Sequence, residues 1–470
     1  MRRHQGGNVP DDTTAARLRV LRSALGVPRR GSDPPRAVRS LGARRRAPTA
    51  RGSVKARRWL LALSYAPLLF LIWSIKRRSR KQLHLEETDI EDLIPSIAGL
   101  TQGTLTEGNR VEVLQNGALW DRLFADIEAA QKTINYETFL SKEGELTRRL
   151  SDVLARKARA GVQVRLLLDG TGGRFYGDAD LVRMREAGVK IERYHPVRMR
   201  NIGRINNRDH RKICVVDGCV AYTGGHCLVD AWLGDAEDAD HFRDISVRVE
   251  GPVVAQLQSA FAENWIEESG EVPGGTNFFP RLERAGDVAA HAVWVSTTGS
   301  PSSVKLLHYL LIRAATRRIT IQNPYFLPDP ALRKALIDAV ARGVDVRVMI
   351  PAATASDSPF VQHASHHLYG TLLKGGVRLF DYHNTLLHQK VLVVDERWAS
   401  VGSTNFDARS FDLSDDVSLM IYDERIAREL EDTFDRDLAH ATEAHLDSWL
   451  RRSAKHKLID FSAFVFNEQL

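Results

Sequence analysis

The segments "HRKICVVD" (His210–Asp217) and "HQKVLVVD" (His388–Asp395) repeat one pattern within a single chain. Each contains a histidine, a lysine two positions later, an apolar run and an aspartate. Because alternate residues of a β-strand point to the same side, the histidine and the lysine of each copy are predicted to face one way. Each aspartate lies at an odd spacing from its histidine, on the other face or beyond the strand end. There it is better suited to stabilise a turn than to take part directly in chemistry.

Longer stretches around the two segments also match. "FADIEAAQKTINYETFL" (124–140) aligns with "YLLIRAATRRITIQNPYFL" (309–327), and both read as an amphipathic helix that leads into a short strand. Gly161 and Gly343 each end a predicted helix just before a buried apolar strand. Alternating helices and strands predict an α/β fold with a largely buried sheet, and the duplication predicts two such domains packed as a pseudo-dimer.

The length of 470 residues, with 43% hydrophobic residues, predicts two domains or a fused duplicate. The N-terminal stretch is rich in Arg, Gly, Pro, Ala and Ser, which predicts disorder. An organellar presequence and an upstream translation start remain open alternatives for that stretch. The predicted boundaries are a disordered basic tail (1–58), a membrane segment (59–75), a linker (76–110), a first domain (111–275), a second domain (276–445) and a C-terminal tail (446–470).

The segment "WLLALSYAPLLFLIWSI" (Trp59–Ile75) is uncharged and has basic residues on both sides. A helix of this length just reaches across the apolar core of a bilayer, and tryptophans near both ends are typical of its interfaces. We expect membrane attachment, with a buried soluble helix as the alternative. Basic residues on both flanks give no orientation, and Pro67 permits either a spanning helix or a re-entrant hairpin. The expected location is the cell membrane, with the catalytic body facing the cytoplasm.

Charge and cysteine content argue against two classes of protein. Residues 1–81 hold 21 Lys/Arg and 3 Asp/Glu, which leaves 45 basic and 56 acidic residues in the remainder. A mildly acidic body argues against a nucleic-acid partner, because phosphate backbones require a basic surface. The 3 cysteines (Cys214, Cys219 and Cys227) have the spacing of neither a zinc site nor a disulfide, so we expect reduced thiols.

An imidazole beside a fixed ammonium group suits a phosphate ester better than a metal ion, because the ammonium repels a second cation. The lysine can hold a phosphate oxygen while the histidine nitrogen attacks phosphorus. The small-residue turns "TGGHC" (223–227) and "VGSTN" (401–405) follow the two strands and allow close approach to an anion. Where the two sites meet, one imidazole can form a phosphohistidine while the other acts as general acid and base. We expect this chemistry to use no metal and no cofactor.

This arrangement resembles the phospholipase D superfamily, whose signature is a pair of H-x-K-x4-D segments, each followed by Gly-Gly or Gly-Ser. More narrowly, the chain is similar to bacterial cardiolipin synthases of the phospholipase D type from about residue 111 to about residue 439. The stretches that carry this likeness include "HFRDISVRVEGPVVAQLQSAFAENW", "NPYFLPD" and "LLHQKVLVVDERWASVGSTNFDARSF". The resemblance implies two tandem α/β/α sandwich domains.

The resemblance also implies roles for individual residues. His210 is the expected nucleophile, and His388 is the expected general acid and base. The expected catalytic set is His210, Lys212, Asp217, His388, Lys390 and Asp395; the expected phosphate-binding residues are Gly225, Ser403 and Asn405; and the expected histidine-orienting carboxylates are Asp244 and Asp416.

One position departs from the family pattern. The first small-residue turn ends in Cys227 where the family has asparagine, and a thiol cannot replace a carboxamide. Either His226 or another group replaces the amide, or phosphate binding is weaker in this half, with lost activity as a further alternative. A reactive thiol at Cys227 is a weaker hypothesis than simple filling of space.

Five further residues have more than one possible role. Glu137 either lines the cleft or lies at a solvated strand end. Tyr325 and Phe326 are predicted to be core or substrate-wall residues rather than catalytic ones. His363 and His366 are predicted to lie on a helix surface rather than in a metal site.

These observations lead to a predicted activity. A membrane-associated enzyme would transfer a phosphatidyl group between two phosphatidylglycerol molecules, producing cardiolipin and glycerol. A lipid hydrolase, or a transphosphatidylase with another donor or acceptor, would use the same residues. A nucleic-acid phosphodiesterase and a non-catalytic lipid-binding scaffold are the remaining alternatives. The oligomeric state is left open.

Overall fold

The computed structural model describes residues 90–196, 207–295 and 302–465. The predicted disordered tail and the hydrophobic segment at 59–75 lie outside these residues. Among the helices within the described ranges, none combines the length and the apolar character that crossing a bilayer requires.

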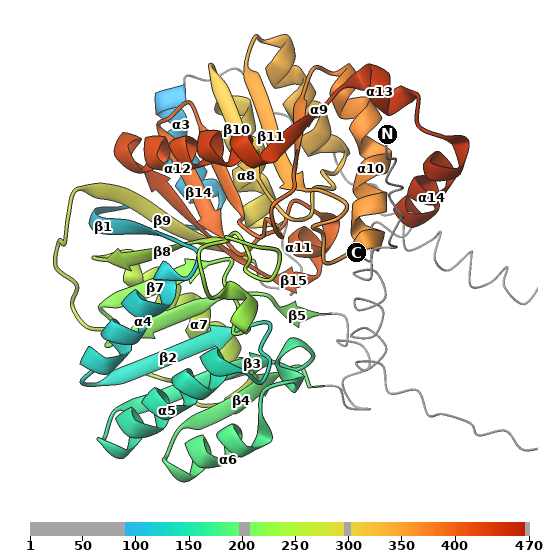
Figure 1. The fold of residues 1–470 in the computed structure, drawn as a ribbon. Coiled ribbons are helices and arrows are strands. Elements are labelled where there is room, and N and C mark those ends of the chain that lie inside the picture. The colour runs from blue at the N-terminus through green and yellow to red at the C-terminus, as the bar shows by residue number, and fades with distance from the viewer. Residues whose placement is uncertain (1–89, 197–206, 296–301, 466–470) are drawn as a thin grey trace, which may run out of the picture. The chain divides into compact units, whose positions relative to one another are not determined.

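The first half of the body alternates strands and helices and ends in a long helix (Figure 1). Its elements are α3 (Ile90–Leu100), β1 (Thr106–Gln115), α4 (Ala118–Ala129), β2 (Thr133–Thr138), α5 (Glu145–Arg159), β3 (Gln163–Asp169), η1 (Gly172–Arg174), α6 (Asp178–Glu186), β4 (Lys190–Tyr194), β5 (Arg208–Asp209), β6 (Ile213–Val216), β7 (Val220–Gly224), η3 (Asp230–Trp232), β8 (Ile245–Glu250) and α7 (Val254–Ser269).

The second half repeats this order and adds two helices at its end. Its elements are β9 (Val288–Trp294), α8 (Ser303–Ala314), β10 (Arg318–Gln322), α9 (Pro330–Ala341), β11 (Asp345–Pro351), α10 (Pro359–Lys374), β12 (Arg378–Tyr382), β13 (Val391–Val394), β14 (Trp398–Gly402), α11 (Ala408–Asp412), β15 (Ser414–Asp415), β16 (Val417–Tyr422), α12 (Glu424–Asp437), η4 (Leu438–His440), β17 (Ala441–Ala444), α13 (Leu446–Leu450) and α14 (Ala454–Phe464).

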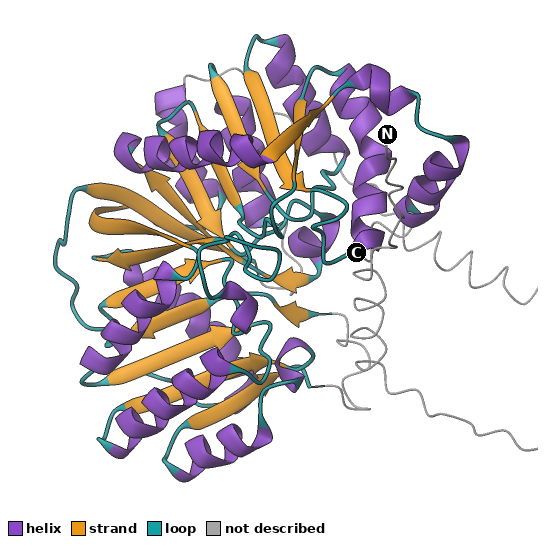
Figure 2. Cartoon of the chain, viewed as in Figure 1, coloured by secondary structure: helices purple, strands orange, loops and turns teal. Residues whose placement is uncertain are grey.

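A single mixed sheet runs through both halves, with helices packed against it (Figure 2). Its strand order is β17-β12-β11-β10-β13-β14-β16-β9-β1-β8-β7-β6-β2-β3-β4. β1 and β9 pair antiparallel at the centre, and the order outward from each is the same apart from the extra edge strand β17. This symmetry is the predicted duplication: two α/β units form a pseudo-dimer within one chain.

One hydrophobic core is shared by the two halves. It brings apolar residues of β6, β7, β8 and α7 together with residues of β13, β14, β16 and α12. Each half also has its own core on the other side of the sheet. Because the apolar side chains of this shared core are almost fully buried, removal of this face from water holds the halves together.

Each histidine segment forms short backbone contacts with the opposite half. β5 pairs in parallel with β15, and the His210 N–H donates to the carbonyl of Asp415 at 2.9 Å. The equivalent contact joins Arg243 to Leu387, and the His388 N–H donates to the carbonyl of Arg243 at 2.8 Å. β5 and β15 lie side by side where the halves meet (Figure 1). Both histidine segments are therefore brought to one interface.

The motif aspartates stabilise turns. Asp217 and Asp395 have φ of 54° and 56°, a left-handed conformation that aspartate tolerates better than most residues. The Asp217 carboxylate accepts the backbone N–H groups of 131–133, and the Asp395 carboxylate accepts those of 316–318. These contacts support the turn-stabilising role indicated by the spacing and argue against counting either aspartate among residues that touch a substrate.

The predicted linker and the predicted C-terminal tail both contain helices. α3 lies within the predicted linker and buries Leu93 and Ile97 in the core of the second half. α13 and α14 lie within the predicted C-terminal tail, and α14 packs against α10. The glycine ends were predicted correctly, since Gly161 and Gly343 follow α5 and α9 with φ of 94° and 93°.

Replacing Asp395 with alanine is expected to lower the melting temperature by several degrees. The change leaves the N–H groups of 316–318 without their acceptor, and each such loss costs about 1–3 kcal/mol when buried. Differential scanning fluorimetry measures the shift. Asp121→Ala is the matched control, because the Asp121 side chain is 85% exposed and its ion pair contributes little. Equal melting temperatures for the two variants would contradict the assigned role.

Candidate active site

Each motif histidine is paired with a carboxylate from the other half of the molecule. His210 Nδ1 lies 2.8 Å from Asp416 Oδ1, and His388 Nδ1 lies 2.8 Å from Asp244 Oδ2. A carboxylate at Nδ1 favours the tautomer that carries its proton on this nitrogen. The Nε2 atom of each ring then carries the lone pair.

The two carboxylates are fully buried and held by further donors. Trp232 Nε1 donates to Asp244 Oδ2 at 2.7 Å, and the Ser403 hydroxyl donates to Asp416 Oδ1 at 2.6 Å. Burial alone would raise the pKa of Asp244, but His226, His388 and Lys390 outweigh it and leave this pKa below its usual value. For Asp416, burial is likewise outweighed, chiefly by His210, and its pKa is also lowered. Both carboxylates are therefore ionised at neutral pH.

The motif lysines lie against their own histidines. Lys212 Nζ donates to the carbonyl of His210 at 2.7 Å, and Lys390 Nζ donates to the carbonyl of His388 at 2.5 Å. Lys390 Nζ also lies 3.0 Å from both ring nitrogens of His388. Burial lowers the pKa of Lys390 to about 7, with Asp244 opposing and Lys212 adding to the effect. An anion bound beside Lys390 would favour its charged form.

Both histidines are neutral at physiological pH. Burial, assisted by Lys212, lowers the pKa of His210 to about 4, and burial, assisted by Lys390, lowers that of His388 to about 4. Each histidine also experiences the charge of the lysine from the other half, which places all four groups in one electrostatic environment. A neutral imidazole is the form that can attack phosphorus or accept a proton.

Aromatic rings pack beside both histidines. Phe139 meets His210 edge to face at 5.0 Å, and Lys212 Nζ lies 5.3 Å from the centre of the same ring. Trp232 meets His388 edge to face at 5.1 Å. These rings exclude water and restrict the rotation of the imidazoles.

The three expected phosphate-binding residues occupy different environments. The Asn405 side chain is buried, and only its Nδ2 group could donate to a phosphate oxygen, because its Oδ1 atom is an acceptor. The Ser403 hydroxyl already donates to Asp416, and the Gly225 N–H already donates to the carbonyl of Ile245. A Cβ atom at Gly225 would collide with the Asp244 carboxylate. Ser403 and Gly225 therefore adjoin the orienting carboxylates, and their contact with phosphate stays a prediction.

Cys227 is a buried thiol that fills space. Its side chain is 2% exposed, and burial raises the pKa of the thiol. His226 does not substitute for the missing amide, because its Nδ1 contacts the Ser246 hydroxyl and its Nε2 contacts the carbonyl of Asn116. The first half therefore has no carboxamide at the position of Asn405.

Other residues singled out from the sequence are also placed. Glu137 is fully buried rather than solvated, its Oε1 accepts from Asn264, and burial raises its pKa to about 7. Phe326 is a core residue, as one of its two predicted roles required. Tyr325 donates its hydroxyl hydrogen to Asp357, whose charge acts on Lys390, so Tyr325 lies beside the site.

Two clusters of described residues have the composition of a metal site, and neither contains a motif residue. Glu237, Asp238 and His241 form the first of them and are largely exposed. His363, His366 and Asp460 form the second, between α10 and α14. Burial lowers the pKa of His366 to about 4, so this histidine is not the simple surface residue that the sequence predicted.

Sequence reasoning did not find Trp232, Phe139 or Asn116 as supporting residues. The Asn116 carboxamide accepts from the Asp244 N–H and from Arg243, so it fixes the backbone next to an orienting carboxylate. Trp232 lies in η3, between the first small-residue turn and β8. Only the residue type could have given a signal, because a buried indole has one N–H donor and this donor needs an acceptor.

In this duplicated α/β fold, the histidine of each H-x-K-x4-D segment is oriented by a carboxylate of the other half. This arrangement defines a protein with paired phospholipase D-like domains. The family model described as "Cardiolipin synthase, PLD-like domain" matches residues 123–265 and 310–438. The chain belongs to this family of cardiolipin synthases with phospholipase D-like domains, and the resemblance drawn from the sequence is confirmed.

Curated relatives agree with this membership, and a solved structure shares the fold. Major cardiolipin synthase ClsA of Bacillus subtilis is 36% identical over 371 residues, which are 77% of this chain and 76% of that protein. Cardiolipin synthase of Oceanobacillus iheyensis is 35% identical over 339 residues, which are 72% of this chain and 70% of that protein. The crystal structure of phosphatidylserine synthase from Haemophilus influenzae is similar in fold, with a TM-score of 0.60 and 12% identity over 80% of this chain and 99% of that one.

Thiol labelling of the native protein is expected to modify Cys219 and to spare Cys214 and Cys227. Cys219 is exposed, whereas the other two thiols are buried and their pKa values are raised by burial. Maleimide treatment followed by peptide mass spectrometry measures this, with the denatured protein as the control in which all three react. Rapid modification of Cys227 in the native protein would show that this thiol is accessible and not a space-filling group.

Proposed function

We propose that this protein is a membrane-associated phosphatidyltransferase that converts two phosphatidylglycerol molecules into cardiolipin and glycerol. The observation that carries the proposal is the exchanged pairing of the two motif histidines with Asp416 and Asp244. That pairing supplies two oriented imidazoles to one site, which is what a two-step transfer at phosphorus requires. The relatives named cardiolipin synthase support the choice of lipid.

In the first step, His210 attacks the phosphorus of one phosphatidylglycerol. The bond from Nε2 to phosphorus forms as the bond from phosphorus to the glycerol oxygen breaks, and His388 gives the departing oxygen a proton. The pKa of His388 is about 4 in the substrate-free protein, chiefly because of burial. A bound phosphodiester anion partly neutralises Lys390 and thereby raises this pKa, which favours the protonated form that the step needs.

In the second step, the nucleophile is the terminal hydroxyl of another phosphatidylglycerol, whereas a hydrolase would use water. His388, now neutral, removes the hydroxyl proton. The oxygen attacks the phosphorus of the phosphohistidine, and the new phosphorus–oxygen bond forms as the bond from phosphorus to His210 Nε2 breaks. The products are cardiolipin and the original His210. Lys212, Lys390 and the Asn405 carboxamide stabilise charge on the phosphate oxygens in both steps.

The hydrophobic segment at 59–75 is proposed to attach the protein to the cell membrane, with the catalytic body on the cytoplasmic side. Both acyl chains of each substrate remain in the bilayer, so the site must operate at its surface. Attachment close to the N-terminal end of the body keeps the site near its substrate.

Purified full-length protein is expected to produce cardiolipin and glycerol from phosphatidylglycerol vesicles. Thin-layer or liquid chromatography of the lipids, with glycerol measured in parallel, checks the outcome. Phosphatidic acid as the main product would replace the transferase assignment with a hydrolase. Absence of turnover would favour a lipid-binding scaffold.

His388→Ala and His210→Ala are each expected to lower turnover by about a hundredfold or more, because each removes a group that exchanges protons or electrons with the substrate. His445→Ala is the control, since this exposed histidine on α13's N-terminal side is outside the site. Melting temperatures measured for all three variants separate loss of chemistry from loss of fold. Full activity in His388→Ala would refute the assigned roles.

The rate constant kcat/KM is expected to fall as the pH rises through about 7. Lys390 has a pKa of about 7 in the substrate-free protein, so above this pH its positive charge and its attraction for phosphate are lost. In Lys390→Arg the charge is retained, because an arginine side chain does not lose its proton in this range. The alkaline fall should then move to higher pH, whatever the absolute activity of the variant.

The matched control for this pH profile is Lys212→Arg, which makes the same substitution in the other half. Its alkaline fall should remain near pH 7, because Lys390 is unchanged. Identical pH profiles for Lys390→Arg and the unmodified protein would rule out Lys390 as the group responsible.

A further inference from the structure

The last helix of the described chain exposes an apolar stripe. Leu458 is 65% exposed, Phe461 is 52% exposed and Val465, directly after α14, is 43% exposed. Spacings of three and four residues place these side chains on one face of the helix. Large apolar residues gathered on one solvent-facing stripe indicate a surface that meets another apolar phase.

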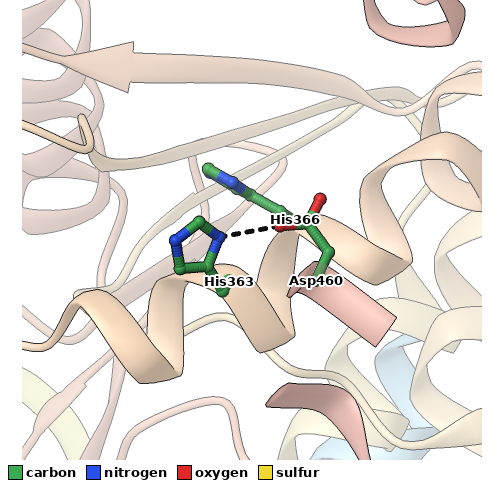
Figure 3. Close-up of side chains that lie close together, drawn as sticks. All are labelled: His363, His366 and Asp460. Carbon is green, nitrogen blue, oxygen red and sulfur yellow. Dashed lines mark hydrogen bonds and ion pairs between the residues drawn. The ribbon is translucent and has the colours of Figure 1, made fainter. Parts of the chain in front are cut away.

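The opposite face of α14 is fixed against α10 by a polar clamp. Asp460 is 1% exposed, and its Oδ1 lies 2.8 Å from His363 Nδ1 (Figure 3). Its other oxygen accepts from Arg452 NH1 at 2.8 Å. Since both carboxylate oxygens already have cationic or N–H partners, the cluster of His363, His366 and Asp460 serves here as a clamp rather than as a metal site.

Ring contacts strengthen this clamp. The His367 ring lies 4.5 Å from that of Phe464, and Ala463 of the same face is 2% exposed. The helix is thus held in one rotational setting. Turning the apolar stripe inward would break the contacts of Asp460 with His363 and Arg452 and would expose this carboxylate to solvent, so these contacts favour the observed setting.

Basic residues border the stripe on both sides. At 100° per residue, Lys457 lies on one flank of the Leu458 and Phe461 stripe and Lys455 lies on the other. Arg451 adds a third exposed cation just before the helix, and Asp460 is the only acidic residue from 451 to 465. Lysines on both edges of an apolar stripe match the charge and geometry of an anionic lipid surface, in which apolar side chains enter the acyl region and ammonium groups reach phosphate.

We propose that α14 lies in the headgroup layer of an anionic bilayer and holds the catalytic body against the lipid surface. The proposal rests on the proposed function only for the identity of the anionic lipid, phosphatidylglycerol. Figure 1 shows α14 at the margin of the second half, beside α10. α10 begins just after Asp357, whose contact with Tyr325 reaches the neighbourhood of Lys390, so contact through α14 brings this side of the site toward the membrane.

The first test measures the environment of Leu458 directly. The full-length protein carries Leu458→Cys in a Cys219→Ser background, because Cys219 is the exposed native thiol and the other two are buried. The introduced thiol is labelled with the fluorophore NBD, and the protein is placed in nanodiscs of phosphatidylcholine alone or with phosphatidylglycerol. Fluorescence should rise severalfold and shift to the blue only in discs that contain phosphatidylglycerol, and lipids carrying a quencher in their acyl chains should quench it.

The matched probe is Val182→Cys on α6, an apolar residue that is 52% exposed in the first half. Its fluorescence should be the same in both kinds of disc. Equal signals from the Leu458 probe in both discs would overturn the proposal. A Leu458 probe that is already shielded in detergent without lipid would also overturn it, because a second copy or another segment of the chain would then cover the stripe.

The second test measures the consequence for turnover. In the double variant Leu458→Glu with Phe461→Glu, cardiolipin formation on phosphatidylglycerol vesicles should fall about tenfold, because apolar contact with the bilayer is replaced by charge repulsion. Turnover of a short-chain phosphatidylglycerol dissolved below its critical micelle concentration should be unchanged, since the site itself is intact. Val182→Glu is the control and should affect neither substrate.

An equal fall on both substrates would show that α14 acts through the fold, which would overturn membrane docking. Unchanged turnover on vesicles would overturn it as well. Absence of cardiolipin from the unmodified protein would instead contradict the proposed function, while the fluorescence test would still report whether α14 enters the lipid.

Discussion

Each motif histidine depends on a carboxylate that the other half of the molecule supplies. His210 is oriented by Asp416 and His388 by Asp244, and the N–H of each histidine donates to the carbonyl of the residue that precedes its carboxylate. Neither half can therefore assemble a complete oriented imidazole alone. The shared core beneath β7, β8, β14 and β16 is required for the site as well as for stability, because separation of the halves would disconnect both pairs.

The backbone contacts at the two histidines are equivalent, but the buried cations beside them differ in origin. The cation beside His210 comes from the same half as the histidine, and the cation beside His388 comes from the other half. Beside His210, the cation Arg211 belongs to the motif strand and contacts Glu263. Beside His388, the motif strand has Gln389 instead, and the cation is Arg243 from the other half, paired with Asp437. Arg211 and Glu263 belong to the same half, whereas the pair of Arg243 and Asp437 crosses between the halves, so a shifted pairing would leave Arg243 without its acid. This asymmetry specifies one alignment of two otherwise similar units.

The sequence predicted the duplicated α/β fold and both histidine segments, because periodicity and spacing are local properties. It also identified Asp244 and Asp416, but not which histidine each one meets, since the exchange between halves is a property of tertiary packing. Trp232 could not be found for the same reason: its indole reaches Asp244 only after η3 folds back on β8. The helices α13 and α14 were missed because a short, charged segment resembles a tail in sequence. The contacts of Asp460 with His363 and Arg452, which hold α14 in place, form only in the folded protein.

The small-residue turns acquire a different meaning from this geometry. In the first half, Gly225 leaves room for Asp244, which a Cβ atom would meet. In the second half, Ser403 occupies the equivalent position and donates to Asp416. Both turns thus seat the carboxylate of their own half, and that carboxylate orients the histidine of the other half. In the proposed mechanism, recognition of phosphate falls mainly to the lysines and to Asn405, which only the second half provides, so the two halves would share the orientation of the imidazoles but divide the binding of the anion unequally.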